Sequence, residues 1–267
     1  MQLFENASEA VWRRLGYSLV SGTIEIGHQV VLERADDSAP RYFYDLISPE
    51  EAVSTVVFNN VEEQAKWVTQ SILKNLTDDE LEHSDILVIF PEPLTVKSQA
   101  SLLRSLLKSA GVSSHIAGIT TSRDELFQDN SIAITGIYRA KGNEAPMVYV
   151  LNSEYALEGP ELIKRRNTLF TAITRSNAWV RICGVGAKME QLKAEVDKVV
   201  SNDFQLKFTV PSATQLAQLK KIYREITHDE REKIRSLSEL ADLIEKGDLS
   251  VESIPEELRE KIKRQFG

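Results

Sequence analysis

The sequence predicts a doubly wound α/β domain, in which helices cover both faces of a parallel sheet. Short apolar runs alternate with helical segments from about residue 48 onward. The run 86–90 is continuously apolar and is ended by Pro91, which is typical of a strand buried on both faces. The segment 98–110 has a helical pattern and ends at Gly111, a common helix terminator. Apolar strands that alternate with helices indicate a parallel sheet with helices on both sides.

The remaining elements continue this alternation. Asn60, with Glu63 three residues later, predicts the start of a long helix, because an asparagine side chain can cap the first free backbone amides. Ser48, followed by Pro49 and Glu51, predicts another helix start. We expect further strands at 55–58, 115–118, 131–137, 147–151 and 179–184, and further helices at 160–176 and 187–200.

Changes in character along the chain predict three parts. Residues 1–50 contain short β-like runs punctuated by glycine, which suit a hairpin or entry segment. Residues 51–205 carry the α/β alternation. Residues 211–267 are charged and amphipathic, with helix starts at Thr227 and Ser253, so we expect an α-helical appendage there.

Composition bounds the class of protein. The chain has 267 residues, of which 42% are hydrophobic and 27% are charged, as in globular proteins. No apolar run approaches the roughly 20 residues that cross a bilayer, and the N-terminus lacks the features of a signal peptide, so we expect a cytoplasmic protein and no membrane partner. Cys183 is the only cysteine, and we expect no metal site. The net charge of −8 disfavours indiscriminate binding to nucleic acid but allows a locally basic groove.

The polar segment 138–146 lies between two predicted strands and contains a glycine. Ligands of open parallel sheets bind beyond the carboxyl ends of the strands, so this segment is a candidate site. Its basic side chains could meet phosphate oxygens, and Glu144 could accept a hydrogen bond from a ribose hydroxyl. The same segment could instead be a charged surface turn.

The segment 164–176 ends a predicted helix with Thr174 and Arg175. A guanidinium has five donors on a planar fork, and this geometry suits a phosphate or a carboxylate. Taken alone, this segment favours the simpler interpretation of Arg175 as a solvated arginine at a helix end.

Together the two segments resemble a known family. The stretch TGIYRAKGNEA at 135–145, followed by a strand, resembles motif V of the UvrD/Rep-type superfamily I helicases, roughly T-x-H-x-x-K-G-x-E-F. The stretch FTAITRS at 170–176, preceded by Arg165 and Arg166, resembles motif VI. The strand at 85–90 with its following helix resembles the motif IV region. The resemblance spans about residues 55–185 and keeps the order of the motifs.

The resemblance implies a RecA-like (P-loop NTPase-like) second domain, which meets ATP at its boundary with a first domain. Arg175 matches the catalytic arginine finger, Glu144 matches the glutamate that meets the ribose, and Gly142 permits close backbone approach. The expected motif IV arginine is absent, and Lys97 is the nearest cation. We expect the side chain of Arg175 to project from the sheet edge toward a cleft.

The resemblance also implies contacts with nucleic acid, either single-stranded DNA or RNA. The residues in the matching positions are Tyr138, Arg139, Lys141 and Thr174. Tyr138 stands where the family has histidine, and an aromatic ring in that position could stack on a base.

A phosphate-binding loop requires G-x-x-x-x-G-K-[ST], and the sequence has no Gly-Lys dipeptide. The stretch DELFQ at 124–128 resembles a magnesium box, but a mostly polar stretch precedes it instead of an apolar strand. We therefore expect ATP and Mg²⁺ to be bound mainly by a P-loop-containing helicase domain 1, in the same full-length chain or in trans. We also expect no ATPase activity from this chain alone.

Two other functions remain open. The chain could be a RecA-like module that binds nucleic acid or protein without motor activity. It could also be a complete enzyme of another α/β class, such as a small hydrolase, although no nucleophile elbow supports that interpretation.

Overall fold

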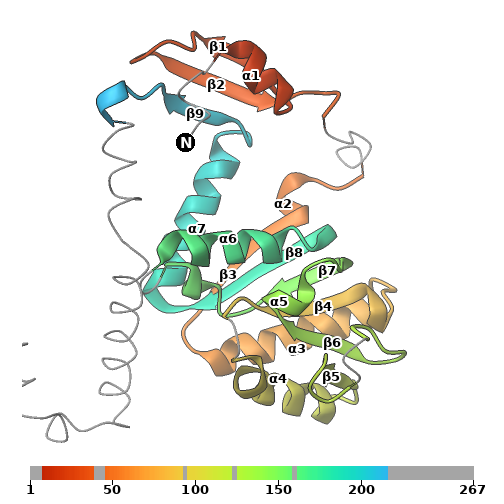
Figure 1. Cartoon of the computed structure of the whole chain (residues 1–267). Helices are drawn as coiled ribbons and strands as arrows, with labels where there is room; N and C mark the ends of the chain where they lie inside the picture. The colour runs from red at the N-terminus through yellow and green to blue at the C-terminus, as the bar shows by residue number, and fades with distance from the viewer. Residues whose placement is uncertain (1–7, 39–45, 93–94, 122–124, 158–160, 216–267) are drawn as a thin grey trace, which may run out of the picture. The chain divides into compact units, whose positions relative to one another are not determined.

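A computed structural model of the chain describes residues 8–38, 46–92, 95–121, 125–157 and 161–215 (Figure 1). The chain divides into two compact units, and Asn6–Val210 contains every helix and strand named below. Most of the predicted appendage 211–267, with the helix starts at Thr227 and Ser253, lies outside the described residues. The division into three parts therefore stays a prediction.

Six strands form one sheet in the order β3-β8-β7-β4-β6-β5. The strands are β3 (Val53–Phe58), β4 (Ile86–Phe90), β5 (Ser114–Ile116), β6 (Ile132–Gly136), β7 (Ala145–Val150) and β8 (Ser176–Val185). Every pair of neighbours in this sheet is parallel. Strands that follow one another in the sequence are not always adjacent in the sheet; β3 and β4, for example, are separated by β8 and β7. The predicted doubly wound α/β class is confirmed.

Helices cover both faces of this sheet (Figure 1). The helices of the unit are α1 (Glu9–Arg14), α2 (Pro49–Ala52), α3 (Val61–Thr77), α4 (Val96–Ser109), α5 (Ile137–Ala140), α6 (Leu162–Ile173) and α7 (Gly186–Ser201), with 3-10 turns η3 (His83–Asp85) and η4 (Ser153–Leu157). Along β4, Val88 packs in the apolar cluster that includes residues of α3 and α4. Its neighbours Leu87 and Ile89 pack with α5, α6 and α7. Alternate residues of one strand therefore fill two cores, which explains its continuous apolar run.

The helix starts predicted at Asn60 and Ser48 are confirmed in their atomic detail. The Asn60 side chain accepts a hydrogen bond from the backbone N–H of Glu63 at 2.9 Å and caps α3. Ser48 Oγ accepts from the backbone N–H of Glu51 at 3.2 Å, with Pro49 in the first turn of α2. These contacts satisfy amides that have no partner within the helix.

Two differences from the sequence prediction lie in the candidate segments. The helix expected at 160–176 ends at Ile173, because the chain enters β8 at Ser176 and not at residue 179. The segment expected as a loop after residue 137 contains the one-turn helix α5. Both differences arise where pairing with a distant strand or packing on the sheet overrides local preference.

A second, antiparallel sheet has the order β1-β2-β9, with β1 (Tyr17–Gly22), β2 (Gln29–Arg34) and β9 (Leu206–Thr209). Trp12 of α1 is buried in it, with its ring 6.0 Å from Tyr17 and 5.8 Å from Phe208. The β-like runs of the N-terminal segment do form a hairpin. The sequence did not predict β9, which joins a strand that lies far earlier in the chain.

Within the described residues, no helix is long and apolar enough to cross a membrane. The same residues contain no cluster of three or more His, Cys, Asp or Glu side chains that could hold a metal ion.

Replacing Ile89 with alanine should lower the free energy of unfolding by about 2–5 kcal/mol, because Ile89 is fully buried in the central strand. Ile26→Ala is the matched control, since the same side chain is 64% exposed there; its effect should stay within about 0.5 kcal/mol. Urea unfolding followed by circular dichroism measures both. Equal losses for the two variants would contradict the assignment of β4 to the core.

Candidate functional site

The first residues of β7 and β8 bring the two candidate segments together. Ala145 pairs with Ser176, and the backbone N–H of Ala145 donates to the carbonyl oxygen of Arg175 at 3.0 Å. Glu144 and Arg175, which directly precede these residues, are therefore neighbours across the ladder. The sequence places them in separate motifs, and the strand register unites them.

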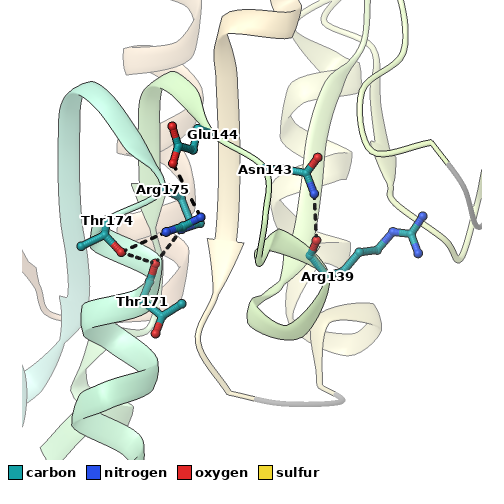
Figure 2. Close-up of polar contacts among 6 residues, drawn as sticks. All are labelled: Arg139, Asn143, Glu144, Thr171, Thr174 and Arg175. Atoms are coloured by element: carbon teal, nitrogen blue, oxygen red, sulfur yellow. Dashed lines mark hydrogen bonds and ion pairs between the residues drawn. The ribbon is translucent and has the colours of Figure 1, made fainter.

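The guanidinium of Arg175 has three partners (Figure 2). Its Nε donates to the carbonyl oxygen of Thr171 at 3.1 Å, and its Nη2 donates to Thr174 Oγ1 at 3.3 Å. Its Nη1 lies 3.8 Å from Glu144 Oε1. The Arg175 side chain is 17% exposed and that of Glu144 is 53% exposed. The cation is thus mostly covered, while the carboxylate remains open to solvent.

This orientation differs from the expected one, in which Arg175 projects from the sheet edge. The side chain is folded back over the end of α6. The last carbonyls of a helix have no partner within the helix and carry partial negative charge, so they attract a cation. Thr171 supplies such a carbonyl, and Glu144 adds a full negative charge. Extension of Arg175 requires these contacts to break.

Gly142 lies in the turn between α5 and β7, with a φ of +89°. Apart from Gly142 and its two chain neighbours, no atom of the described residues lies within 4 Å of the position where a Cβ would stand. The backbone of this exposed turn is therefore open to close approach by a ligand, as the resemblance implies. Lys141, the preceding residue, is also exposed.

The residues expected to contact nucleic acid have different surroundings. Tyr138 is 65% exposed on α5, and Thr174 is exposed at the end of α6. Arg139 is partly buried, and its Nη2 donates to the carbonyl oxygen of Glu125 at 3.3 Å. In Figure 2 its side chain extends away from the pair formed by Arg175 and Glu144.

Lys97 is not brought to this pair. Lys97 is exposed in the first turn of α4, and this helix follows the carboxyl end of β4. Glu144 and Arg175 instead precede the amino ends of β7 and β8, which run parallel to β4 in the same sheet. Neighbouring parallel strands of this length separate the two edges by roughly 17–20 Å. The expectation that the site lies beyond the carboxyl ends of the strands is therefore wrong for Glu144 and Arg175.

The two other arginines of the motif VI segment have partners of their own, which sequence reasoning did not identify. Arg166 forms a paired ion contact with Glu195 of α7, and this hydrogen bonding raises the pKa of Arg166. The Arg165 guanidinium lies 4.3 Å from the ring centre of Tyr155. The first contact joins α6 to α7 and the second joins α6 to η4, and the spacing of the residues in the sequence does not predict either one. Arg175 is the arginine of this segment that lies next to Glu144.

Comparison with known proteins agrees with the motifs. The family model described as the UvrD-like helicase C-terminal domain matches residues 131–183, which contain both candidate segments. No curated protein matches the chain. Among solved structures, the C-terminal domain of a possible DNA helicase from Lactobacillus plantarum WCFS1 is similar, with 18% identity, a TM-score of 0.40, and coverage of 55% of this chain and 83% of that one. The family match confirms the resemblance over residues 131–183.

A double-mutant cycle on Arg175 and Glu144 should give a coupling energy of at most about 1 kcal/mol, because the pair is long and half open to water. The cycle compares the unfolding free energies of Arg175→Ala, Glu144→Ala and the double variant with that of the unsubstituted chain. A coupling of about 3 kcal/mol or more would identify a structural ion pair, which could not release Arg175 to a ligand.

Proposed function

We propose that this chain, whose residues 131–183 match the UvrD-like helicase C-terminal domain, is the second RecA-like domain of an ATP-dependent superfamily I DNA helicase or translocase. The observation that carries the proposal is the meeting of Glu144 and Arg175 at the start of β7 and β8. One side chain suits a ribose hydroxyl and the other suits a phosphate, and both lie beside the open turn at Gly142.

In this proposal, a first domain with a phosphate-binding loop holds most of the ATP and Mg²⁺, in the same full-length chain or in trans. Glu144 accepts from the ribose, and Gly142 allows the backbone to approach the nucleotide. Arg175 then leaves the end of α6 and extends to the γ-phosphate, where it stabilises the charge that develops during phosphoryl transfer. Lys97 is not included, since it lies at the other edge of the sheet.

The energies allow this movement. A partly exposed ion pair is worth about 0–1 kcal/mol, and each hydrogen bond adds about 0.5–1.5 kcal/mol. An arginine finger contributes about 10³–10⁵ in rate, which corresponds to about 4–7 kcal/mol. The interaction with the transferring phosphate therefore outweighs the contacts that retract the side chain.

We propose that the motor binds single-stranded DNA and moves along it, and RNA is the alternative nucleic acid. Tyr138 offers an exposed aromatic ring for stacking on a base, and Lys141 and Thr174 offer exposed polar groups for phosphates. We expect the working protein in the cytoplasm.

The retracted Arg175 favours one alternative, a RecA-like module that binds nucleic acid or protein without motor activity. In such a module the contacts to Thr171 and Glu144 would be permanent. The effect of Arg175 on ATP turnover separates the two functions.

In the complete motor, which includes the phosphate-binding loop, Arg175→Ala should lower ATP turnover by about 10³-fold or more and leave nucleotide affinity nearly unchanged. Steady-state ATPase assays and nucleotide titrations measure the two effects. Arg104→Ala is the matched control: Arg104 lies on α4, on the opposite face of the sheet, and donates to Ser114. Full turnover by the Arg175 variant would contradict the assignment of Arg175 as the arginine finger.

The chain by itself should hydrolyse no ATP above the background rate, with or without single-stranded DNA, because the proposal gives the phosphate-binding loop to another domain. A coupled phosphate-release assay on the purified chain tests this expectation. Turnover that is stimulated by DNA and absent from an Arg175→Ala preparation would show that this chain builds a whole site, contrary to the proposal.

A further inference from the structure

Arg139 occupies a place in the fold that its position in the motif does not suggest. Its guanidinium lies directly against the backbone of Gly118: a Cβ on Gly118 would stand 2.7 Å from Nη1 and 2.8 Å from Cζ. The same group donates to the carbonyl oxygen of Glu125 at 3.3 Å. Gly118 and Glu125 belong to the connection between β5 and β6, so Arg139 joins α5 to that connection.

The connection is itself anchored to the edge of the sheet. His115 is buried, and its Nε2 donates to the carbonyl oxygen of Leu126 at 2.8 Å, since a carbonyl can only accept. Gly118 N donates to Thr121 Oγ1 at 3.2 Å. Arg139 therefore contacts a connection that is hydrogen-bonded to the edge strand β5 through Leu126.

The helix that Arg139 fastens is short. The four residues of α5 form one turn, which has little stability of its own. Its own residues Ile137 and Ala140 are buried, and the carbonyl oxygen of Arg139 accepts from Asn143 Nδ2 at 3.3 Å. Tyr138 stands on the exposed side of this turn. Its direction therefore depends on what holds α5 in place.

We propose that Arg139 is a positioning residue that clamps α5 against Gly118 and Glu125 and thereby presents the ring of Tyr138 to a base of single-stranded nucleic acid. This inference rests on the proposed function for its ligand, although the clamp itself does not. Gly118 is necessary for this contact, because it has no side chain and a φ of +74°. The guanidinium of Arg139 fills the space that a side chain would occupy.

A clamp and a phosphate contact respond differently to salt. Loss of a cation that binds phosphate lowers the slope of log affinity against log salt by about one. Loss of a clamp weakens stacking and leaves that slope unchanged. Arg139→Lys adds a second distinction, because lysine keeps the charge and loses the planar group that lies on Gly118.

The experiment measures binding of the chain to fluorescent oligo(dT) over a range of salt concentrations. Arg139→Ala and Arg139→Lys should both weaken binding by roughly 5- to 150-fold, as loss of one stacked base does, with the slope of the unsubstituted chain. Lys141→Ala is the reference for a phosphate contact and should lower the slope by about one. The double variant of Arg139→Ala and Tyr138→Ala should bind no worse than Tyr138→Ala alone.

Two glycines provide a matched pair of controls. Gly118→Ala should weaken binding like Arg139→Ala, because the new methyl group displaces the guanidinium while its charge remains. Gly111→Ala should not, since Gly111 has a similar φ of +79° and nothing within 4 Å of the added Cβ. A lower salt slope for Arg139→Ala, with affinity restored by Arg139→Lys, would identify a phosphate contact and overturn the clamp.

Hydrogen exchange tests the clamp without nucleic acid. The amides of 137–143 should exchange faster in Arg139→Ala and Gly118→Ala than in the unsubstituted chain and Gly111→Ala. Unchanged exchange in the first two variants would overturn the clamp. If the unsubstituted chain fails to bind oligo(dT) while exchange behaves as expected, the clamp stands and the proposed contact with nucleic acid fails.

Discussion

The hydrogen bond from the Ala145 amide to the Arg175 carbonyl aligns the first residues of β7 and β8. Because parallel strands start at the same edge of a sheet, this register places Glu144 beside Arg175. A shift by one residue would turn the side chains of one strand to the other face and separate the pair. The register shifts by one residue between Ala145 and Met147, and beyond that point Val148 and Val180 pair and are buried in the same core. The pairing of Ala145 with Ser176, at the start of both strands, therefore brings the two candidate residues together.

The surroundings of Arg175 suit a group that changes position. Its partners are a helix-end carbonyl, a hydroxyl and a half-exposed carboxylate at 3.8 Å, and none of them binds it strongly. Arg166 and Arg139 instead contact other segments of the fold, Arg166 through Glu195 and Arg139 through the carbonyl oxygen of Glu125. Three arginines of two neighbouring motifs therefore have three environments, and in the proposed motor Arg175 is the one that moves.

Much of the fold follows from local patterns, and much of the site does not. The caps at Asn60 and Ser48 and the apolar run of β4 are local signals, and each one marks the element that the structure contains. Strand β9 is short and its partner β2 lies far earlier in the chain, so the sequence does not show that the two strands pair. The motifs identify Glu144 and Arg175 as separate residues, but only the register of β7 and β8 shows that they meet. The retraction of Arg175 depends on Thr171 and Glu144 together, and spacing in the sequence does not encode it.

The position of the Arg175 guanidinium in the complete motor, bound to ADP and a transition-state mimic of the γ-phosphate, tests the central claim most directly. A structure of that complex should show the guanidinium detached from the Thr171 carbonyl and within hydrogen-bond distance of the mimic, with Glu144 at the ribose. A guanidinium still held by Thr171 and Glu144, with the mimic contacted by other residues, would contradict the account.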